Sequence, residues 1–189
     1  MSLLEAVILS LASAVVKQPI TAAIDSTGFG THILVSEVRA MKEILEHAHV
    51  KLHVLYDAER LVFLMAAATS GDIADSTVLM SLVGAVIDAV TIARMLGDPA
   101  YSSRENVQFL ADLGIEPVIP PNESAGALAK GHSAWRRLIL EFMELGVERW
   151  VEEKGYGLRF TSESIFSALK LKFGWVLSPR LLRCELESS

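Results

Sequence analysis

The chain has 189 residues, of which 51% are hydrophobic, and a formal net charge of −6. This length and composition predict one globular domain over residues 1–189, and the acidic balance argues against nucleic-acid binding by bulk electrostatics alone. The single cysteine, Cys184, excludes an internal disulfide and fits a reducing compartment. The apolar start is interrupted by Glu5 and is too short to span a bilayer, so we expect a cytoplasmic protein without a signal peptide or membrane contact.

The charges are distributed unevenly along the chain. Residues 1–129 contain 7 Lys and Arg against 15 Asp and Glu, whereas residues 130–183 contain 10 against 6. An acidic first part followed by a basic last part favours carboxylates that bind divalent cations beside a basic surface for phosphates.

The first elements are an apolar helix and a short strand. Residues 1–17 predict a helix that is either buried or a self-association segment of a homo-oligomer, and Pro19 ends it. Residues 20–24 are β-prone and predict a strand that stops at Asp25, before a turn containing Gly28 and Gly30. Residues 32–38 and 41–49 are ambiguous, and the second of these segments predicts a short helix or an irregular connection.

The middle of the chain alternates between strands and helices. Residues 51–56 and 61–69 predict a hairpin whose turn exposes Asp57 and Glu59 to solvent. A helix over 76–88, a strand over 90–96 ending before Asp98, a helix from Ser102 or Ser103 to 113 and a short strand over 116–119 follow. Helices fill the rest, from 133 to 147 or beyond and from 155 to 173. This order predicts an α/β domain with a mixed central sheet flanked by helices.

The last helix carries a suggestive set of side chains. Glu163 and Lys170 are seven residues apart and share one face, with Arg159 and Tyr156 flanking it; Thr161 and Ser162 are candidate N-caps. The opposite face is an apolar stripe. An isolated pair of this kind is most often a solvated helix face. The alternative is a carboxylate and several long donors that together hold a metal ion and an anionic backbone.

Three acids stand out by position: Asp25 and Asp98 at strand ends, and Glu163 on the late helix. Carboxylates delivered from two strands and a helix can bind a pair of Mg²⁺ or Mn²⁺ ions. Asp25 and Asp98 taken singly would be ordinary turn residues. Asp72 and Asp75 compete with them, although helix capping accounts for Asp75. Three histidines (His47, His49 and His53) invite a zinc site, but without a nearby cysteine we expect satisfied or exposed side chains.

These stretches resemble insertion-sequence transposases of the DDE type. The resemblance rests on residues 25–29, 51–53, 97–106, 117–121 and 155–173. Tyr156, Arg159, Glu163 and Lys170 match at every position the Tyr-Arg-Glu-Lys signature of one transposase group. The resemblance implies an RNase H-like fold. It also implies that Asp25, Asp98 and Glu163 are the catalytic ligands of two Mg²⁺ or Mn²⁺ ions, and that Tyr156, Arg159 and Lys170 contact DNA.

The sequence differs from such transposases at both ends. Only 24 residues precede Asp25 and 15 follow Gly174, so we expect a core shortened at both ends that lacks recognition of element termini. The expected activity is metal-dependent cleavage of DNA, an exonuclease-like hydrolysis of single strands or ends with little sequence preference. The alternatives are a transposase subunit that needs a partner for DNA recombination, and an inactive remnant that serves in DNA binding or oligomerisation.

Overall fold

A computed structural model of the chain describes residues 3–31, 50–122, 133–174 and 176–177. The ambiguous segments at 32–38 and 41–49 lie outside the described residues, and so do His47, His49 and Cys184.

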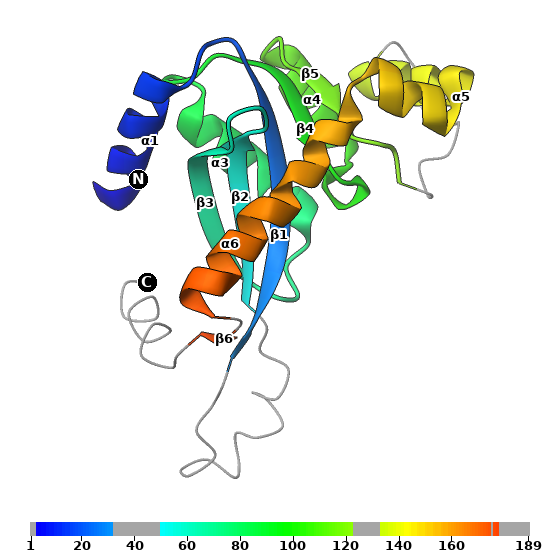
Figure 1. Cartoon of the computed structure of the whole chain (residues 1–189). Coiled ribbons are helices and arrows are strands. Elements are labelled where there is room, and N and C mark those ends of the chain that lie inside the picture. Colours follow the sequence, from blue (N-terminus) through cyan, green and yellow to red (C-terminus); the bar gives the residue numbers. More distant parts are fainter. Residues whose placement is uncertain (1–2, 32–49, 123–132, 175, 178–189) are drawn as a thin grey trace.

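A mixed sheet forms the centre of the molecule (Figure 1). Its strands are β1 (Ile20–Thr31), β2 (Val50–Asp57), β3 (Val62–Ser70), β4 (Ile92–Gly97), β5 (Glu116–Val118) and β6 (Val176–Leu177). The spatial order is β3-β2-β1-β4-β5, with β6 pairing the far end of β1. Strands β1, β2 and β3 run antiparallel as a meander, whereas β4 and β5 join β1 in parallel. The predicted α/β class with a mixed sheet is therefore confirmed.

Helices cover both faces of this sheet. They are α1 (Leu3–Val15), η1 (Asp75–Thr77), α3 (Leu79–Val86), η2 (Pro99–Tyr101), α4 (Arg104–Asp112), α5 (Ala134–Glu153), η3 (Tyr156–Thr161) and α6 (Ser162–Phe173), of which the three η elements are 3-10 helices. Ser103 accepts a hydrogen bond from the Asn106 N–H and begins α4 as predicted, and Gly114 with φ 74° follows its end. Gly146 with φ 72° kinks α5.

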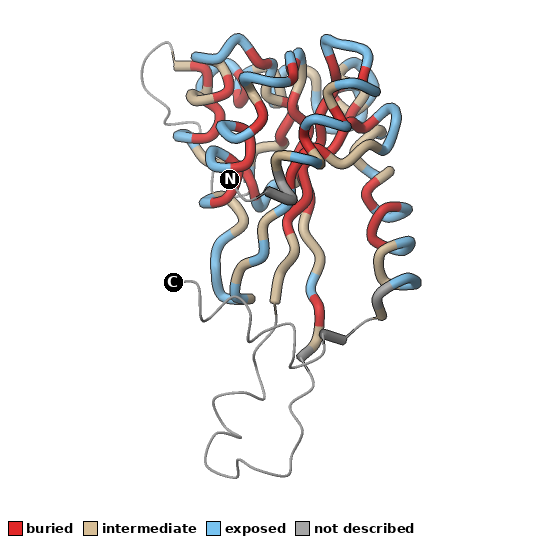
Figure 2. Tube along the Cα trace, turned by 90° about the vertical axis from the view of Figure 1, so that its left-hand side faces the viewer, coloured by how far each residue is buried: buried red, intermediate tan, exposed pale blue. Residues whose placement is uncertain are grey.

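Alternation along β1 separates the core into two layers. Ala22 and Ile24 face the cluster formed with α1, α3 and α4, whereas Ala23 faces the cluster formed with α5, η3 and α6. Trp150, Ile165 and similar residues fill the second cluster, and α6 crosses that face of the sheet (Figure 1). Figure 2 shows the buried positions concentrated in the half of the sheet that both helix layers cover. Because side chains alternate, Asp25 points to the same face as Ala23, toward η3 and α6.

The structure corrects the predicted end of the first strand. Asp25 does not terminate β1, and Gly28 and Gly30 are strand residues rather than a turn. Antiparallel pairing with β2 continues from Ala22 opposite Asp57 to Phe29 opposite Val50, and these ladder hydrogen bonds outweigh the weak strand propensity of the glycines. What ends near Asp25 is the pairing with β4, whose last registered pair is Ile24 with Gly97.

The hairpin is confirmed, but its aspartate is not solvated. Asp57 is completely buried. Its Oδ1 accepts the backbone N–H groups of Glu59 and Arg60 at 2.9 and 3.3 Å, and Oδ2 accepts from the Arg60 guanidinium at 3.0 Å. The carboxylate thus closes the turn that follows β2, and Leu61 completes that turn at a φ of 57°.

The amino-terminal helix α1 packs on one edge of the sheet. Leu9, Ala12 and Val16 are buried there, whereas Val7, Leu11 and Val15 lie on the outer face at 46%, 65% and 62% exposure. No helix among the described residues is long and apolar enough to cross a membrane. The prediction of an apolar helix is confirmed, and part of its apolar surface has no cover within the described chain.

The core assignment predicts a large contrast between two leucines. Leu96 in β4 is fully buried, whereas Leu140 in α5 is 51% exposed. Leu96→Ala should lower the free energy of unfolding by about 2–5 kcal/mol, because it removes buried methyl groups and leaves a cavity. Leu140→Ala should change it by less than about 0.5 kcal/mol. Urea unfolding followed by circular dichroism measures both, and equal losses would contradict the assignment of this sheet to the core.

Candidate active site

Two of the three predicted acids lie side by side where β1 and β4 part. Asp98 directly follows β4, whose pairing with β1 ends at Ile24 and Gly97, and Asp25 is the next residue of β1. Because β1 and β4 are parallel neighbours, residues that follow the same registered pair lie at the same end of the pairing. The register alone therefore brings Asp25 and Asp98 together. Asp25 is buried and the Asp98 side chain is about one quarter exposed.

A single arginine lies between these carboxylates. Nη2 of Arg159 is 3.4 and 3.3 Å from Oδ1 and Oδ2 of Asp25, and 3.4 Å from Oδ2 of Asp98. Arg159 belongs to η3, and its backbone carbonyl accepts a hydrogen bond from the Tyr56 hydroxyl at 3.1 Å. The segment that carries Arg159 is therefore attached to β2, in the middle of the sheet.

Hydrogen bonds fix the orientation of both carboxylates. Oδ1 of Asp25 accepts the Ser26 N–H at 2.8 Å, and Oδ2 accepts the Ser162 hydroxyl at 2.6 Å. Oδ1 of Asp98 accepts the Ala100 N–H at 2.8 Å, which makes Asp98 the cap of η2. Ser162 therefore does not serve as the N-cap of α6; Thr161 holds that position, without a capping hydrogen bond from its side chain.

Burial raises the pKa of Asp98 above its ordinary value, and the nearby Asp25 and Asp75 add to this, against the lowering effect of the Ala100 N–H and Arg159. A carboxylate that is both desolvated and close to other carboxylates gains from any cation that enters the site. Acids whose pKa is shifted in this way concentrate at functional sites.

Glu163 is not brought together with the two aspartates. It lies in the first turn of α6, one residue after Ser162, and its side chain is exposed. Across residues 3–31, 50–122, 133–174 and 176–177, no group of three His, Cys, Asp or Glu side chains is close enough to hold a metal ion. The assignment of Glu163 as the third ligand stays a prediction.

The other three signature residues occupy different environments. Tyr156 is buried at 7% exposure and donates its hydroxyl to the Gly97 carbonyl at 3.1 Å. Burial raises its pKa to about 12. Lys170 Nζ lies 5.7 Å from the centroid of the Phe29 ring at the far end of β1. Tyr156 thus helps to hold the end of β4 next to η3, and the roles of Tyr156, Arg159 and Lys170 toward DNA stay predictions.

Sequence reasoning set aside another carboxylate, Asp75, whose charge acts on Asp98 and whose partners come from β1 and β2. Asp75 is not a cap: the residue at the N-cap of η1 is Ala74, with no side-chain capping bond. Instead the Asp75 carboxylate accepts the Ser26 hydroxyl at 2.9 Å and the Lys51 ammonium at 2.8 Å. The predicted hairpin placed Lys51 at the start of a strand, but nothing in the sequence shows that η1 approaches that strand.

His53 belongs to a buried polar chain beside the site. Its Nδ1 lies 3.0 Å from the Tyr101 hydroxyl and its Nε2 lies 2.9 Å from the Thr69 hydroxyl. Burial lowers the pKa of His53 and raises that of Tyr101. The expectation of a satisfied histidine is confirmed for His53, and its two nitrogens have these hydroxyl partners in place of a metal.

The aspartate pair suits a divalent cation. Both carboxylates lie within 3.4 Å of one positive group, the Arg159 guanidinium, so an oxygen from β1 and one from the residue after β4 lie beside the same position. Mg²⁺ and Mn²⁺ prefer oxygen ligands and keep positions for water and phosphate oxygens, so two protein carboxylates form an adequate minimal set. Asp25 and Asp98 are accordingly the residues that would hold such an ion.

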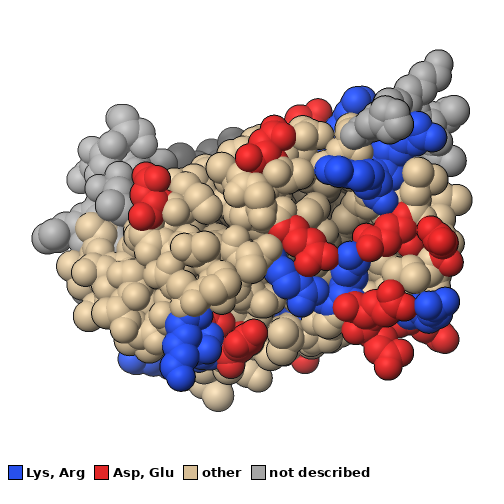
Figure 3. Space-filling view, turned by 90° about the horizontal axis from the view of Figure 1, so that it is seen from above, with Lys and Arg blue, Asp and Glu red and all other residues tan. Residues whose placement is uncertain are grey.

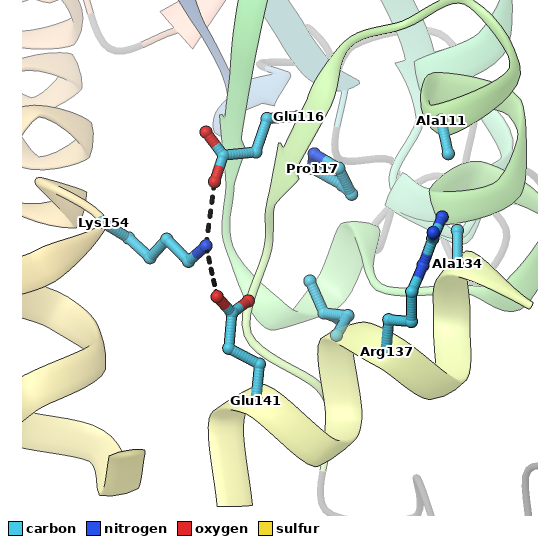
Figure 4. A pocket seen from close by; sticks show the side chains of 8 residues that line it. Ala111, Glu116, Pro117, Ala134, Arg137, Glu141 and Lys154 are labelled. Atoms are coloured by element: carbon cyan, nitrogen blue, oxygen red, sulfur yellow. Dashed lines mark hydrogen bonds and ion pairs between the residues drawn. The ribbon is translucent and has the colours of Figure 1, made fainter. Parts of the chain in front are cut away.

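A pocket of the described chain lies away from the aspartate pair. Its cavity volume is about 360 Å³, and it lies between α4, β5 and α5 (Figure 4). Lys154 crosses its rim, with Nζ 2.8 Å from Glu116 and 2.6 Å from Glu141. None of the three predicted acids lines this pocket. Seen from above, charges of both signs gather toward the α5 side, whereas the rest of that face is mostly uncharged with a few separate acidic and basic groups (Figure 3).

The environment of Asp75 predicts a pH-dependent stability. Although burial acts to raise its pKa, the hydrogen bonds from Lys51 and Ser26 lower it below the ordinary value of 3.8. A lowered carboxyl pKa stabilises the fold above that ordinary value, and the effect is lost as the pH falls through the folded-state pKa. Asp75→Asn should therefore cost about 1 kcal/mol at pH 7.

The cost of Asp75→Asn should shrink as the pH falls below about 3.8, when the wild-type carboxyl also becomes neutral. Denaturant unfolding at a series of pH values measures the difference. Asp88→Asn, at an exposed position, is the matched control and should change the free energy of unfolding by less than about 0.5 kcal/mol. A constant cost for Asp75→Asn at all pH values would contradict the ion pair.

Comparison with known proteins agrees with this geometry. The model of the transposase DDE domain family matches residues 17–179, a range that includes the sheet, the aspartate pair and α6. No curated protein matches the chain. Members of the family bind DNA and cleave phosphodiester bonds with divalent metal ions, and the observed sheet is that of their RNase H-like fold. The chain belongs to the family of transposase DDE domains.

Proposed function

We propose that this protein is a single-domain nuclease core of transposase type that cleaves DNA in the cytoplasm. Its substrates are single strands or DNA ends, and it acts with little sequence preference, as an exonuclease does. The observation that carries this proposal is the pair of carboxylates of Asp25 and Asp98. Both face the Arg159 guanidinium at the carboxyl end of β4. Nothing in this arrangement requires a nucleophilic side chain.

The residues of the site have distinct roles in this proposal. Asp25 and Asp98 hold the ions, and Glu163 joins them from the first turn of α6. When bound to these residues, two Mg²⁺ or Mn²⁺ ions would supply activation of a water or hydroxyl and stabilisation of the leaving oxygen. The Ser162 hydroxyl and the Ser26 N–H orient the Asp25 carboxylate, so that its oxygens keep their direction without the metal.

Contacts to DNA come from the signature residues. Arg159 and Lys170 lie on η3 and α6, and both can present a cation to backbone phosphates. Tyr156 contributes from within the protein, because its buried hydroxyl bonds the Gly97 carbonyl next to Asp98. We propose that this tyrosine sets the position of the DNA-binding segment relative to the aspartates.

A cleavage assay tests the proposal directly. Labelled single- and double-stranded DNA is incubated with the protein and Mg²⁺ or Mn²⁺, with EDTA as the metal-free arm. Asp25→Asn and Asp98→Asn should each lower the rate by about a hundredfold or more, because metal-assisted stabilisation amounts to several kcal/mol. Glu163→Gln should do the same if it is the third ligand, and Asp88→Asn should retain the wild-type rate.

Activity that persists in EDTA, or that survives both aspartate substitutions, would reject metal-dependent cleavage at this site. The same assay separates two alternatives. Cutting only at inverted repeats and only with a partner chain would identify a transposase subunit. Salt-sensitive DNA binding without turnover in either metal would identify an inactive remnant that binds DNA. This alternative is included because Glu163 does not form a three-acid group with the two aspartates among the described residues.

We also propose that the outer face of α1 mediates self-association. Val7, Leu11 and Val15 repeat every four residues and form one exposed apolar stripe on a helix whose other side is already packed on the sheet. A second copy of this stripe would cover it and would place the two α1 helices against each other.

Substitution of the stripe tests this association. Leu11→Lys should shift the sedimentation coefficient of the protein from that of a dimer to that of a monomer, because a buried lysine opposes the contact. Leu171→Lys is the matched control, since Leu171 is also exposed, at 86%, but lies on α6. A wild-type protein that sediments as a monomer at high concentration would reject the association.

A further inference from the structure

The position of Arg159 between two carboxylates is unusual in its geometry. One nitrogen, Nη2, makes all the contacts, at 3.3 and 3.4 Å to Asp25 and 3.4 Å to Asp98. A guanidinium usually meets a carboxylate through two parallel N–H groups at shorter distances. Here the group is shared between two acids and uses none of that fork geometry.

Other arginines of the chain are held more closely. Arg60 lies 3.0 Å from Asp57, Arg149 lies 3.0 Å from Glu153, and Arg94 lies 3.1 Å from Glu116. Nε of Arg159 is buried and has no hydrogen-bond partner among the described residues. The guanidinium of Arg159 is therefore held in place mainly by the charge of the two aspartates rather than by a complete set of hydrogen bonds.

Charge balance explains why the Arg159 guanidinium lies beside the two aspartates. Asp25 and Asp98 bring two carboxylates to a site that is mostly buried, where unpaired negative charges are costly. One guanidinium compensates half of that charge. A divalent ion compensates the whole of this negative charge. Unlike the guanidinium, it is not attached to the chain by a side chain that must also be accommodated.

The backbone at Arg159 is hydrogen-bonded to the sheet, so a displacement of the guanidinium would involve the side chain rather than the whole segment. The Tyr56 hydroxyl holds the Arg159 carbonyl at 3.1 Å, and Tyr156, three residues earlier, holds the Gly97 carbonyl at 3.1 Å. The guanidinium carbon already lies 5.7 Å from the Phe160 ring centroid, an aromatic surface on which it can rest when it leaves the acids.

We propose that Arg159 is a built-in counterion of the Asp25–Asp98 pair, which keeps the two carboxylates together without metal and which a divalent ion displaces. Arg159 is in this sense a positioning residue, distinct from its proposed contact with DNA. The inference rests on the proposed function, since it assumes that the pair binds metal. It predicts competition between the arginine and the ion in the absence of DNA.

Metal binding by the DNA-free protein tests the inference. Mn²⁺ affinity is measured by calorimetry for the full wild-type chain and for Arg159→Gln. Removal of the competing guanidinium should raise the affinity about tenfold, and it should also lower the melting temperature in EDTA by several degrees. Addition of Mn²⁺ should then stabilise Arg159→Gln more than wild type. If Arg159 only contacted DNA, Arg159→Gln would change neither the Mn²⁺ affinity nor the melting temperature of the DNA-free protein.

Arg60→Gln is the matched control, because it removes an equal charge from another buried aspartate, Asp57, outside the site. It should lower stability but leave the Mn²⁺ affinity unchanged. Equal Mn²⁺ affinity in wild type and Arg159→Gln, or a weaker affinity in the variant, overturns the inference and leaves the proposed function standing. No Mn²⁺ binding by either protein overturns both.

A measurement on the wild-type chain covers the case in which Arg159→Gln does not fold. The nitrogen-15 signals of the arginine side chains are recorded by NMR during titration with Mg²⁺, and the Arg159 signal is assigned with Arg159→Lys. Displacement should shift the Arg159 signal and leave the Arg60 signal in place. A saturating Mg²⁺ titration that leaves the Arg159 signal unchanged overturns the inference.

Discussion

The parallel pairing of β1 with β4 is the constraint on which the site depends. The ladder ends at Ile24 and Gly97, so the next residue of each strand carries its carboxylate to the same edge and the same face. The close approach leaves no space at Gly97, where an added Cβ would lie 3.2 Å from Ile24 and 3.4 Å from Ile119. Both acids are thus positioned by hydrogen bonds between backbones, before any side chain contributes.

Two tyrosine hydroxyls then join this edge to the carboxyl-terminal helices. Tyr56 from β2 holds the carbonyl of Arg159, and Tyr156 from η3 holds the carbonyl of Gly97. Each bond connects a backbone group of one layer with a side chain of the other. The aspartates, the backbone of Arg159 and Ser162 are consequently held next to one another, although Asp25 lies 134 positions before Arg159 and 137 before Ser162.

Local sequence signals predicted most of the helices and strands. They did not predict the lengths of these elements or which of them contact one another. Ser103 and Gly114 mark the limits of α4 through capping and a positive φ, and the hairpin is evident from two apolar runs divided by a polar turn. Strand β1 continues past its glycines because β2 pairs with it, which no local pattern reveals. Asp57 and Asp75 were misjudged for the same reason, since their partners come from the folded arrangement.

The division of the core into two clusters has a consequence for synthesis on the ribosome. The sheet face that contains Ala23, Val54 and Leu96 is covered by Trp150, Tyr156 and Phe166, all of which are translated later. Until those residues are translated, the chain can neither cover this sheet face nor bring Arg159 between Asp25 and Asp98. The site and the second core are therefore both completed by the last-translated part of the described chain.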